Sequence, residues 1–274
     1  MGRNMTNLCS RVMMAVAFCV LVAAASAAAQ EPVPSPSPAA KPKPETLSEA
    51  DPTRPVLWQI RNEYRDLKNG GWSNTVLFRH DRFTFRNLKV KGGAKGFVVR
   101  FDVPLNTVHL GSTTKAGLGD IYAQVLLIPR ISRKFAFSVG SGVILPTATH
   151  DTLGQGKLII APVAVPLWYL AKRRRLITFR MQHYISVAGK SSRADVNQTL
   201  VDPSIGWAVG RRAWIFANTE FKWDWNSKKV GAITGMQFGR MLSDRIGIWI
   251  KPEVPWGPGR TGGFNIKVGI LQFR

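Results

Sequence analysis

The chain has 274 residues and a formal net charge of +22, with 38 basic and 16 acidic residues. Its two cysteines, Cys9 and Cys19, both precede residue 30, so the rest of the chain can hold no disulfide, thiol nucleophile or cysteine metal site. A charge of this size points to nucleic acid or an anionic membrane surface as a partner.

Residues 1–29 have the pattern of a secretory signal peptide. Arg3 and Arg11 are their only charged residues, an apolar run follows from 12 to 25, and small residues of the A-x-A type end the segment. The run is too short for a membrane-spanning helix, which needs about 20 apolar residues. We therefore predict export. Removal of the two arginines leaves 36 basic and 16 acidic residues, a formal net charge of +20, for which anionic lipid is a better partner than nucleic acid.

Residues 30–55 are rich in proline and contain 8 of the 17 prolines in the chain. Such a density disfavours both helix and sheet and favours an extended polyproline spacer. We predict a periplasmic linker here. The alternative is a disordered leader with no partner of its own.

From residue 56 onward, the sequence predicts short strands. The segment nearest to a membrane-spanning helix, 158–170, has only 13 residues and contains Pro162 and Pro166. Apolar residues instead recur at every second position, as in 97–103 and 177–187, with polar residues between them. A tilted barrel strand crosses a bilayer in about 9–11 residues and shows this alternation.

A second signal lies in the connections between these strands. From residue 130 onward, short basic turns alternate with longer polar loops, and outer-membrane barrels likewise have short periplasmic turns and longer external loops. The turns are 128–134, 171–175, 210–212 and 239–245, and the loops are 146–157, 188–199, 225–231 and 255–263. A soluble periplasmic β-sandwich that binds a ligand is the competing fold, but it has no reason to sort its connections in this way.

We predict an all-β fold for residues 56–274: a transmembrane antiparallel up-and-down β-barrel of about twelve strands in the bacterial outer membrane. Ten and fourteen strands are the adjacent alternatives. The predicted strands are 57–65, 72–83, 96–104, 118–129, 134–145, 157–169, 175–187, 197–208, 213–225, 230–239, 245–254 and 263–273. An even number places both ends of the barrel on the periplasmic side.

Tryptophans support the barrel, because most of them lie near predicted strand ends, where amphipathic rings settle at the bilayer interface. They are Trp58, Trp72, Trp168, Trp207, Trp223, Trp225, Trp249 and Trp256. The alternative is a tryptophan core in a soluble domain.

Three motifs resemble those of a known family. They are GLGD at 117–120 with Gln124, GSGVILPT at 140–147, and GQG at 154–156. From about residue 110 to the C-terminus, the chain resembles the outer-membrane family named for the meta-pathway of phenol degradation, whose members are often labelled transporters. The resemblance implies an outer-membrane barrel that admits small, often aromatic, molecules. It brings no established functional residues.

The C-terminus departs from the usual pattern of outer-membrane barrels, which commonly end on an aromatic residue that the barrel assembly machinery recognises. Phe273 is penultimate here and out of step with Ile266, Val268 and Ile270. Either the last strand contains a bulge, or the assembly machinery recognises this C-terminus imperfectly. We expect the assembly machinery to be a partner of the chain.

No catalytic or metal motif is found in the sequence. His80, His109, His150 and His183 have no metal-ligand spacing, and there is no G-x-S-x-G elbow, H-E-x-x-H or phosphate loop. We expect no enzymatic activity, cofactor or metal. The main enzyme alternative is a barrel phospholipase, which needs a serine and a histidine on one face. His80 and Ser73 have opposite parity and would point to opposite sides of the sheet.

The barrel interior is the predicted site. Because side chains alternate between the two faces of a strand, we predict that the following residues point inward and line a substrate path: Arg100, Asp102, Asp120, Tyr122, Gln124, Arg180, Gln182, Tyr184, Asn218, Glu220, Lys222 and Asp224. One hypothesis is a polar passage or cavity that admits or binds small organic molecules, aromatic ones among them, by passive or facilitated passage. The alternative is a structural envelope protein. Its barrel would be plugged because these charges pair with one another, and it would only anchor the proline-rich arm.

The basic turns predict a lipid partner. All of their cations fall on the predicted periplasmic side: Arg130, Arg133, Lys134, Lys172, Arg173, Arg174, Arg175, Arg211, Arg212, Arg240 and Arg245. There they would meet the anionic head groups of the inner leaflet of the outer membrane. The alternative is a set of solvated turn residues that keep the chain soluble in transit.

Overall fold

The computed structural model describes residues 56–84, 96–132, 134–171 and 174–273. The predicted signal peptide and linker lie outside these residues. The described part contains thirteen strands and two short 3-10 turns, η1 (Lys68–Gly70) and η2 (Asp151–Leu153). Within it, no helix combines the length and the apolar character needed to cross a membrane.

The strands follow one another along the chain. Their bounds are β1 Val56–Asp66, β2 Trp72–Thr84, β3 Gly96–Leu110, β4 Thr113–Leu118, β5 Ile121–Ile131, β6 Phe135–Leu145, β7 Lys157–Leu170, β8 Arg175–Gly189, β9 Asn197–Val209, β10 Ala213–Asp224, β11 Lys229–Met241, β12 Ile246–Trp256 and β13 Asn265–Phe273.

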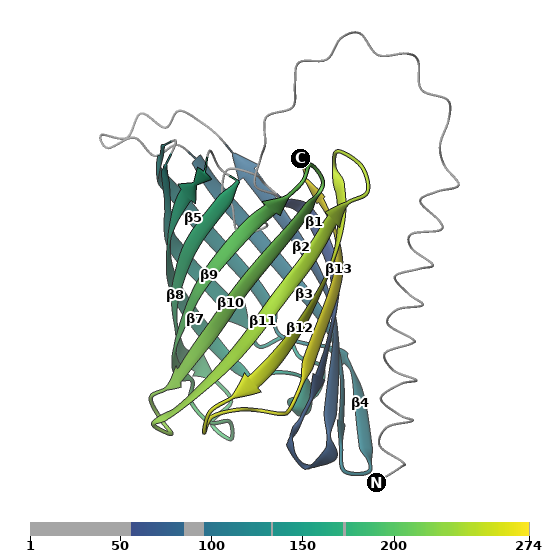
Figure 1. Ribbon diagram of the computed structural model, residues 1–274. Coiled ribbons are helices and arrows are strands. Elements are labelled where there is room, and N and C mark those ends of the chain that lie inside the picture. Colours follow the sequence, from purple (N-terminus) through teal and green to yellow (C-terminus); the bar gives the residue numbers. More distant parts are fainter. Residues whose placement is uncertain (1–55, 85–95, 133, 172–173, 274) are drawn as a thin grey trace, which may run out of the picture. The chain divides into compact units, whose positions relative to one another are not determined.

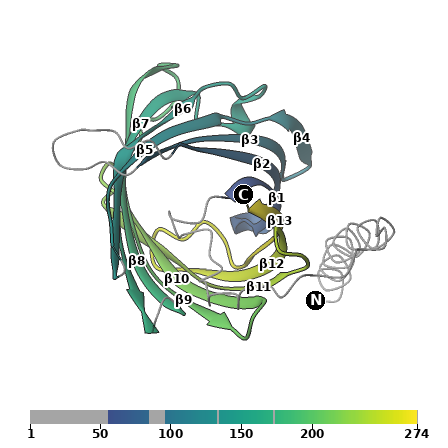
Figure 2. The same ribbon diagram turned by 90° about the horizontal axis from the view of Figure 1, so that it is seen from above.

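All strand pairs are antiparallel, and the sheet closes because β1 pairs with both β2 and β13 (Figure 2). Twelve strands form the wall. The thirteenth, β4, pairs only with the C-terminal half of β3, whereas β5 pairs with the N-terminal half of β3. The predicted twelve-stranded antiparallel barrel is therefore confirmed.

The structure extends the prediction at the β3–β4 hairpin. We expected a strand to end at residue 104, but β3 continues to Leu110 and turns through Gly111 and Ser112 into β4. Gly111 adopts a positive φ of 59°, as a two-residue hairpin turn favours. The weak apolar alternation of this segment concealed the hairpin, although its glycine was a usable signal.

The two faces of the wall differ in chemistry, as the alternation predicted. On β8, Met181 is 41 % exposed on the outer face while the adjacent Gln182 is 3 % exposed on the inner face. The outer face carries large exposed apolar side chains on nearly every strand, among them Ile60, Phe78, Phe101, Val125, Val139, Ile160, Ile185, Phe238 and Ile250. So extensive an exposed apolar surface requires lipid around it, and the chain is an outer-membrane β-barrel.

The barrel has two different ends, visible in Figure 1. At one, which we call the turn end, β1 begins, β13 finishes, and short turns join β5 to β6, β7 to β8, β9 to β10 and β11 to β12. At the other, the loop end, the longer connections 146–156, 190–196 and 257–264 are found. This sorting matches the predicted one at seven of the eight connections, whereas the predicted longer loop 225–231 is only a four-residue turn, 225–228, at the loop end. The assignment of the turn end to the periplasm stays a prediction.

Most tryptophans lie at the ends of the outer face, but Trp249 does not. Trp223, Trp225 and Trp256 are exposed at the loop end, and Trp168 is exposed near the turn end. Trp249 was expected at the interface, yet it is buried. It shares the inward parity of Glu253 on β12, so its ring packs inside the barrel.

The last strand reaches Phe273 without a bulge, because β13 pairs with β12 in continuous register from Asn265 to Gln272. The one register shift with β1 lies between Val56 and Trp58 on β1 itself. Phe273 is therefore out of step with Val268 for a simple reason: its side chain lies on the inner face, where it is buried. Recognition by the assembly machinery stays a prediction.

Candidate functional site: the barrel interior

Paired charges line the inner face of β2 and β3. Arg79 donates two hydrogen bonds to the carboxylate of Asp102, both of 2.7 Å. Arg100 donates two to Asp81, of 2.8 and 2.7 Å. Each pair lies directly across the strands in register, and the sign of the charge reverses from one pair to the next. Such two-pronged contacts hold guanidinium and carboxylate groups in fixed positions.

Two further anions on this side of the wall each contact two cations. On β1, Glu63 forms ion pairs with Arg61 and with Arg65, the latter at 2.8 Å. Across β12 and β13, Glu253 pairs with Lys251 at 2.8 Å and with Lys267 at 3.0 Å. The carboxylates are buried, and the cations outnumber them. The inner wall from β12 through β1 to β3 is therefore packed with charge of net positive sign.

The opposite wall, formed by β8, β9 and β10, is more open to solvent. Arg180 contacts Glu220 at 3.2 Å and Asp202 at 3.7 Å, and the Arg180 and Glu220 side chains are 36 % and 30 % exposed. Lys222 is exposed on the same strand as Glu220. Arg65, 48 % exposed on β1, interacts electrostatically with Glu220. We call Arg65, Arg180, Glu220 and Lys222 the exposed lumen cluster.

A tyrosine on β5 reaches β8 inside the barrel. The ring of Tyr122 on β5 lies over β6 at Gly142, where an added Cβ would come within 2.4 Å of the ring. Its hydroxyl accepts a 2.9 Å hydrogen bond from Gln182 on β8. Glycine at 142 therefore provides the space that lets Tyr122 reach across two strands inside the barrel.

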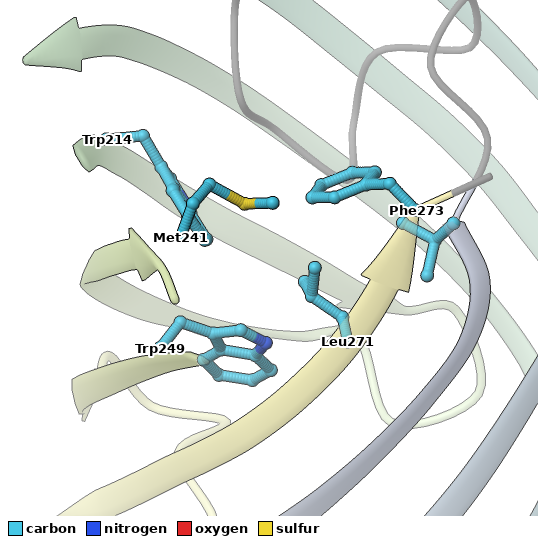
Figure 3. Packing of buried hydrophobic residues seen from close by; sticks show 6 residues of the cluster. Trp214, Met241, Trp249, Leu271 and Phe273 are labelled. Atoms are coloured by element: carbon cyan, nitrogen blue, oxygen red, sulfur yellow. The ribbon is translucent and has the colours of Figure 1, made fainter. Parts of the chain in front are cut away.

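An apolar layer lies nearer the turn end. One cluster combines Val56 on β1 with Trp214, Met241, Trp249, Leu271 and Phe273 on β10 to β13, and Figure 3 shows the side chains of these last five residues gathered together. A second cluster combines Ala136, Leu167, Tyr169 and Leu176 from β6, β7 and β8. Phe216 on β10 packs against both clusters and so links them. Solutes that pass along the interior would meet this layer.

Most residues predicted to line the interior meet there through the contacts described above. Tyr184 lies on the same face of β8 as Arg180, Asn218 donates a 2.8 Å hydrogen bond to Asp202, and Gln124 is buried. Asp224 instead accepts hydrogen bonds from the backbone of the β10–β11 turn. The role of these residues in solute passage stays a prediction.

Several interior residues were missed, chiefly on strands whose faces were not assigned. They are Gln59, Arg61, Glu63, Arg65, Arg79, Asp81, Lys251, Glu253 and Lys267. A signal for them was present, because polar residues occupy every second position from 59 to 65.

Asp120 has a different setting from the other predicted residues, at the loop end. Its two carboxylate oxygens accept hydrogen bonds from the backbone N–H groups of Ala148 and Gln155. A Cβ at Gly154 would lie 2.4 Å from the same carboxylate, so glycine allows the loop to pack against it. Asp120 thus anchors the loop 146–156.

The three motifs that carry the family resemblance meet in this anchor. Thr147 of the second motif donates a 2.9 Å hydrogen bond from its hydroxyl to the carbonyl of Gly119 in the first. Arg193 donates 2.7 and 3.2 Å hydrogen bonds to the carbonyls of Gly154 and Gln155 in the third. Residues of all three motifs therefore take part in the contacts that hold the loop 146–156 at the rim of the barrel.

Replacing Asp120 with alanine is expected to free this loop. Each hydrogen bond to a charged group contributes about 1.5–3 kcal/mol, so amide exchange at Ala148 and Gln155 should accelerate by at least about tenfold. Hydrogen exchange of the purified barrel, with the heat-dependent shift on a denaturing gel as a check of folding, measures this. The Asp244→Asn variant, which removes an exposed acid at the turn end, is the matched control. Unchanged exchange in Asp120→Ala would contradict the anchoring role.

A cavity of about 430 Å³ lies beside the anchored loop, lined by Asp120, His150, Asp151 and Lys190 among others. Lys190 closes on Asp151 with a 2.7 Å ion pair. The hydrogen bond and the charge of Lys190 hold the pKa of Asp151 below its ordinary value. The Lys190–Asp151 ion pair is therefore complete above the ordinary pKa of an aspartate and is lost as the pH falls through the lowered pKa.

Among the described residues, no group of three or more His, Cys, Asp or Glu side chains could hold a metal ion.

No family model and no curated protein matches the sequence. Solved structures do. The COG4313 outer membrane channel from Pseudomonas putida F1 is similar with a TM-score of 0.68 at 10 % identity, over 86 % of this chain and 100 % of that one. The NanC porin has a TM-score of 0.57 at 11 % identity, and the KdgM porin 0.51 at 10 %, each over 78 % of this chain and 98 % of the other. These likenesses confirm the fold, whereas the resemblance to the meta-pathway family stays a prediction.

Proposed function

We propose that the barrel admits small organic solutes by passive or facilitated passage through its interior. The observation that carries this proposal is the exposed lumen cluster: charged side chains on the inner face of a closed barrel that are accessible to solvent. The similar structures named above are a channel and two porins, which supports the same function.

The charge of the interior favours anionic solutes. Arg65, Arg180 and Lys222 outnumber Glu220 in the exposed lumen cluster, and the packed wall adds a further excess of cations. A positive field within low-dielectric walls raises the local concentration of anions. Small organic acids, including the aromatic ones that the family resemblance implies, are therefore the solute class we propose. One similar structure is of the KdgM porin in complex with an oligogalacturonate.

A structural envelope protein is the second candidate, and one observation favours it. The buried ion pairs from β12 to β3 and the apolar layer near the turn end fill part of the interior, as the plugged alternative requires. In that case the barrel would only anchor the proline-rich segment. Ser73 and His80 on β2 face opposite sides of the sheet, which gives no support to the phospholipase alternative.

Liposome swelling with the purified protein separates the two candidates. We expect swelling with small organic anions such as benzoate, and slower swelling with neutral sugars of similar size. A deletion strain should grow more slowly on aromatic acids as the carbon source. Absence of permeability for every solute tested would contradict the proposed passage and favour the structural role.

A further inference from the structure

The turn end of the barrel carries cations with almost no anions beside them. The four short turns between β5 and β12, with the strand ends beside them, carry seven exposed cations: Lys134, Arg174, Arg175, Arg211, Arg212, Arg240 and Arg245. Within the described part of these turns, the one ion pair joins Arg212 to Asp244 at 3.8 Å, and Asp244 is 97 % exposed. The predicted Arg133, Lys172 and Arg173 lie outside the described residues, and so does the side chain of Arg130.

The loop end also carries exposed cations, among them Lys68, Lys115, Lys228, Lys229 and Arg260, but several of its other cations are held by partners within the protein. Lys190 pairs with Asp151 at 2.7 Å and Lys157 with Asp195 at 2.8 Å. Arg193 donates to two backbone carbonyls. The two ends therefore differ in their acids: aspartates pair with cations at the loop end, whereas the described turns of the turn end contain one ion pair, to Asp244.

Two cations of the turn end project from the lipid-facing side of the wall. Arg175 on β8 lies directly opposite Leu170 and Trp207 on the neighbouring strands. Arg240 on β11 lies opposite Ala213 and Ile248. Directly paired residues share one face of a sheet, so both arginines belong to the apolar outer face. Their guanidinium groups therefore sit where acyl chains give way to head groups.

We propose that the turn end binds anionic phospholipid head groups through a ring of cations, which we call the basic rim: Lys134, Arg174, Arg175, Arg211, Arg212, Arg240 and Arg245. Arginine holds phosphate with paired N–H donors, and basic residues beside a bilayer attract its anionic lipids. The exposed Leu170 and Trp168 continue the apolar belt up to this rim, which identifies a lipid surface as the partner. This interaction is separate from solute passage and places the turn end in a phospholipid leaflet.

The test compares lipid preference in an Arg175→Gln/Arg240→Gln variant and in a matched Lys228→Gln/Lys229→Gln variant. The second pair removes two exposed cations from the loop end. Each protein is assembled in phosphatidylcholine vesicles that contain either brominated phosphatidylglycerol or brominated phosphatidylcholine. Quenching of tryptophan fluorescence, to which Trp168 and Trp207 near the rim contribute, then gives the relative affinity for the two lipids.

We expect the parent to prefer phosphatidylglycerol, the arginine variant to lose that preference by a factor on the order of ten, and the lysine control to retain it. An Arg175→Lys/Arg240→Lys variant keeps the charge and should retain most of the preference. An arginine-to-glutamine variant with the preference of the parent, or an equal loss in the loop-end control, would overturn the proposal.

Two further measurements on the parent protein do not depend on any variant. The preference should fall as salt rises, because the screening length shortens from about 10 Å at 0.1 M to about 3 Å at 1 M. A preference for phosphatidylglycerol that does not change with salt concentration would overturn the proposal. Soluble glycerol phosphate should leave the preference nearly intact. If it abolishes the preference at equal phosphate concentration, the rim is a site for small anions, and the lipid assignment is wrong.

Discussion

Replacement of Asp81 with alanine is expected to destabilise the barrel by about 3–5 kcal/mol, the effect of removing one partner of a buried ion pair. Asp81 is 2 % exposed and accepts both hydrogen bonds of Arg100. Without it, Arg100 keeps its charge on the packed inner wall with no anion directly opposite. Equilibrium unfolding in urea of the protein in lipid vesicles measures the loss.

Two variants make this prediction specific. Asp81→Leu/Arg100→Met removes both charges and should recover most of the lost stability, because an apolar pair can replace a buried ion pair at little cost. Asp244→Ala removes an exposed acid at the turn end and should leave the unfolding midpoint unchanged. A double variant as unstable as the single one would show that the pair does not act as a unit.

Replacement of Phe216 with alanine is expected to raise the single-channel conductance. Phe216 packs against both apolar clusters, so the variant opens a gap in the layer that solutes meet near the turn end. Because Phe216 is only partly buried, its stability cost should fall below the roughly 3–5 kcal/mol of a fully buried phenylalanine.

Phe238→Ala is the matched control for this prediction. Phe238 lies on the adjacent strand β11 but is exposed on the outer face. Its replacement should leave the conductance unchanged in planar bilayers. An equal conductance in Phe216→Ala and in the parent would show that the apolar layer does not limit passage.

Alternation and loop length were enough to predict the barrel, because a half-buried strand has to repeat its chemistry every two residues. The same rule failed at Trp249, where the preference of tryptophan for bilayer interfaces was given more weight than its parity with Glu253. It also missed β4, whose residues are nearly all exposed and therefore show little alternation.

The interior was predicted in part. Parity placed Arg180 and Glu220 on one face, but the partner of a charge depends on the register between strands, which parity does not supply. The pairing of Arg79 with Asp102 and that of Arg180 with Glu220 therefore became known only from the structure. For Asp120, the rim loop that it anchors follows 26 residues later in the chain and could not be placed against it from sequence.

The reversal potential of the purified protein across a planar bilayer, measured in a potassium chloride gradient, tests the central claim most directly. We predict a measurable conductance with a preference for chloride, because cations dominate the exposed lumen cluster. The Arg65→Gln/Lys222→Gln variant should retain conductance and lose that preference. Either no conductance above the bare bilayer, or a selectivity that is unchanged in the variant, would contradict passage through this charged interior.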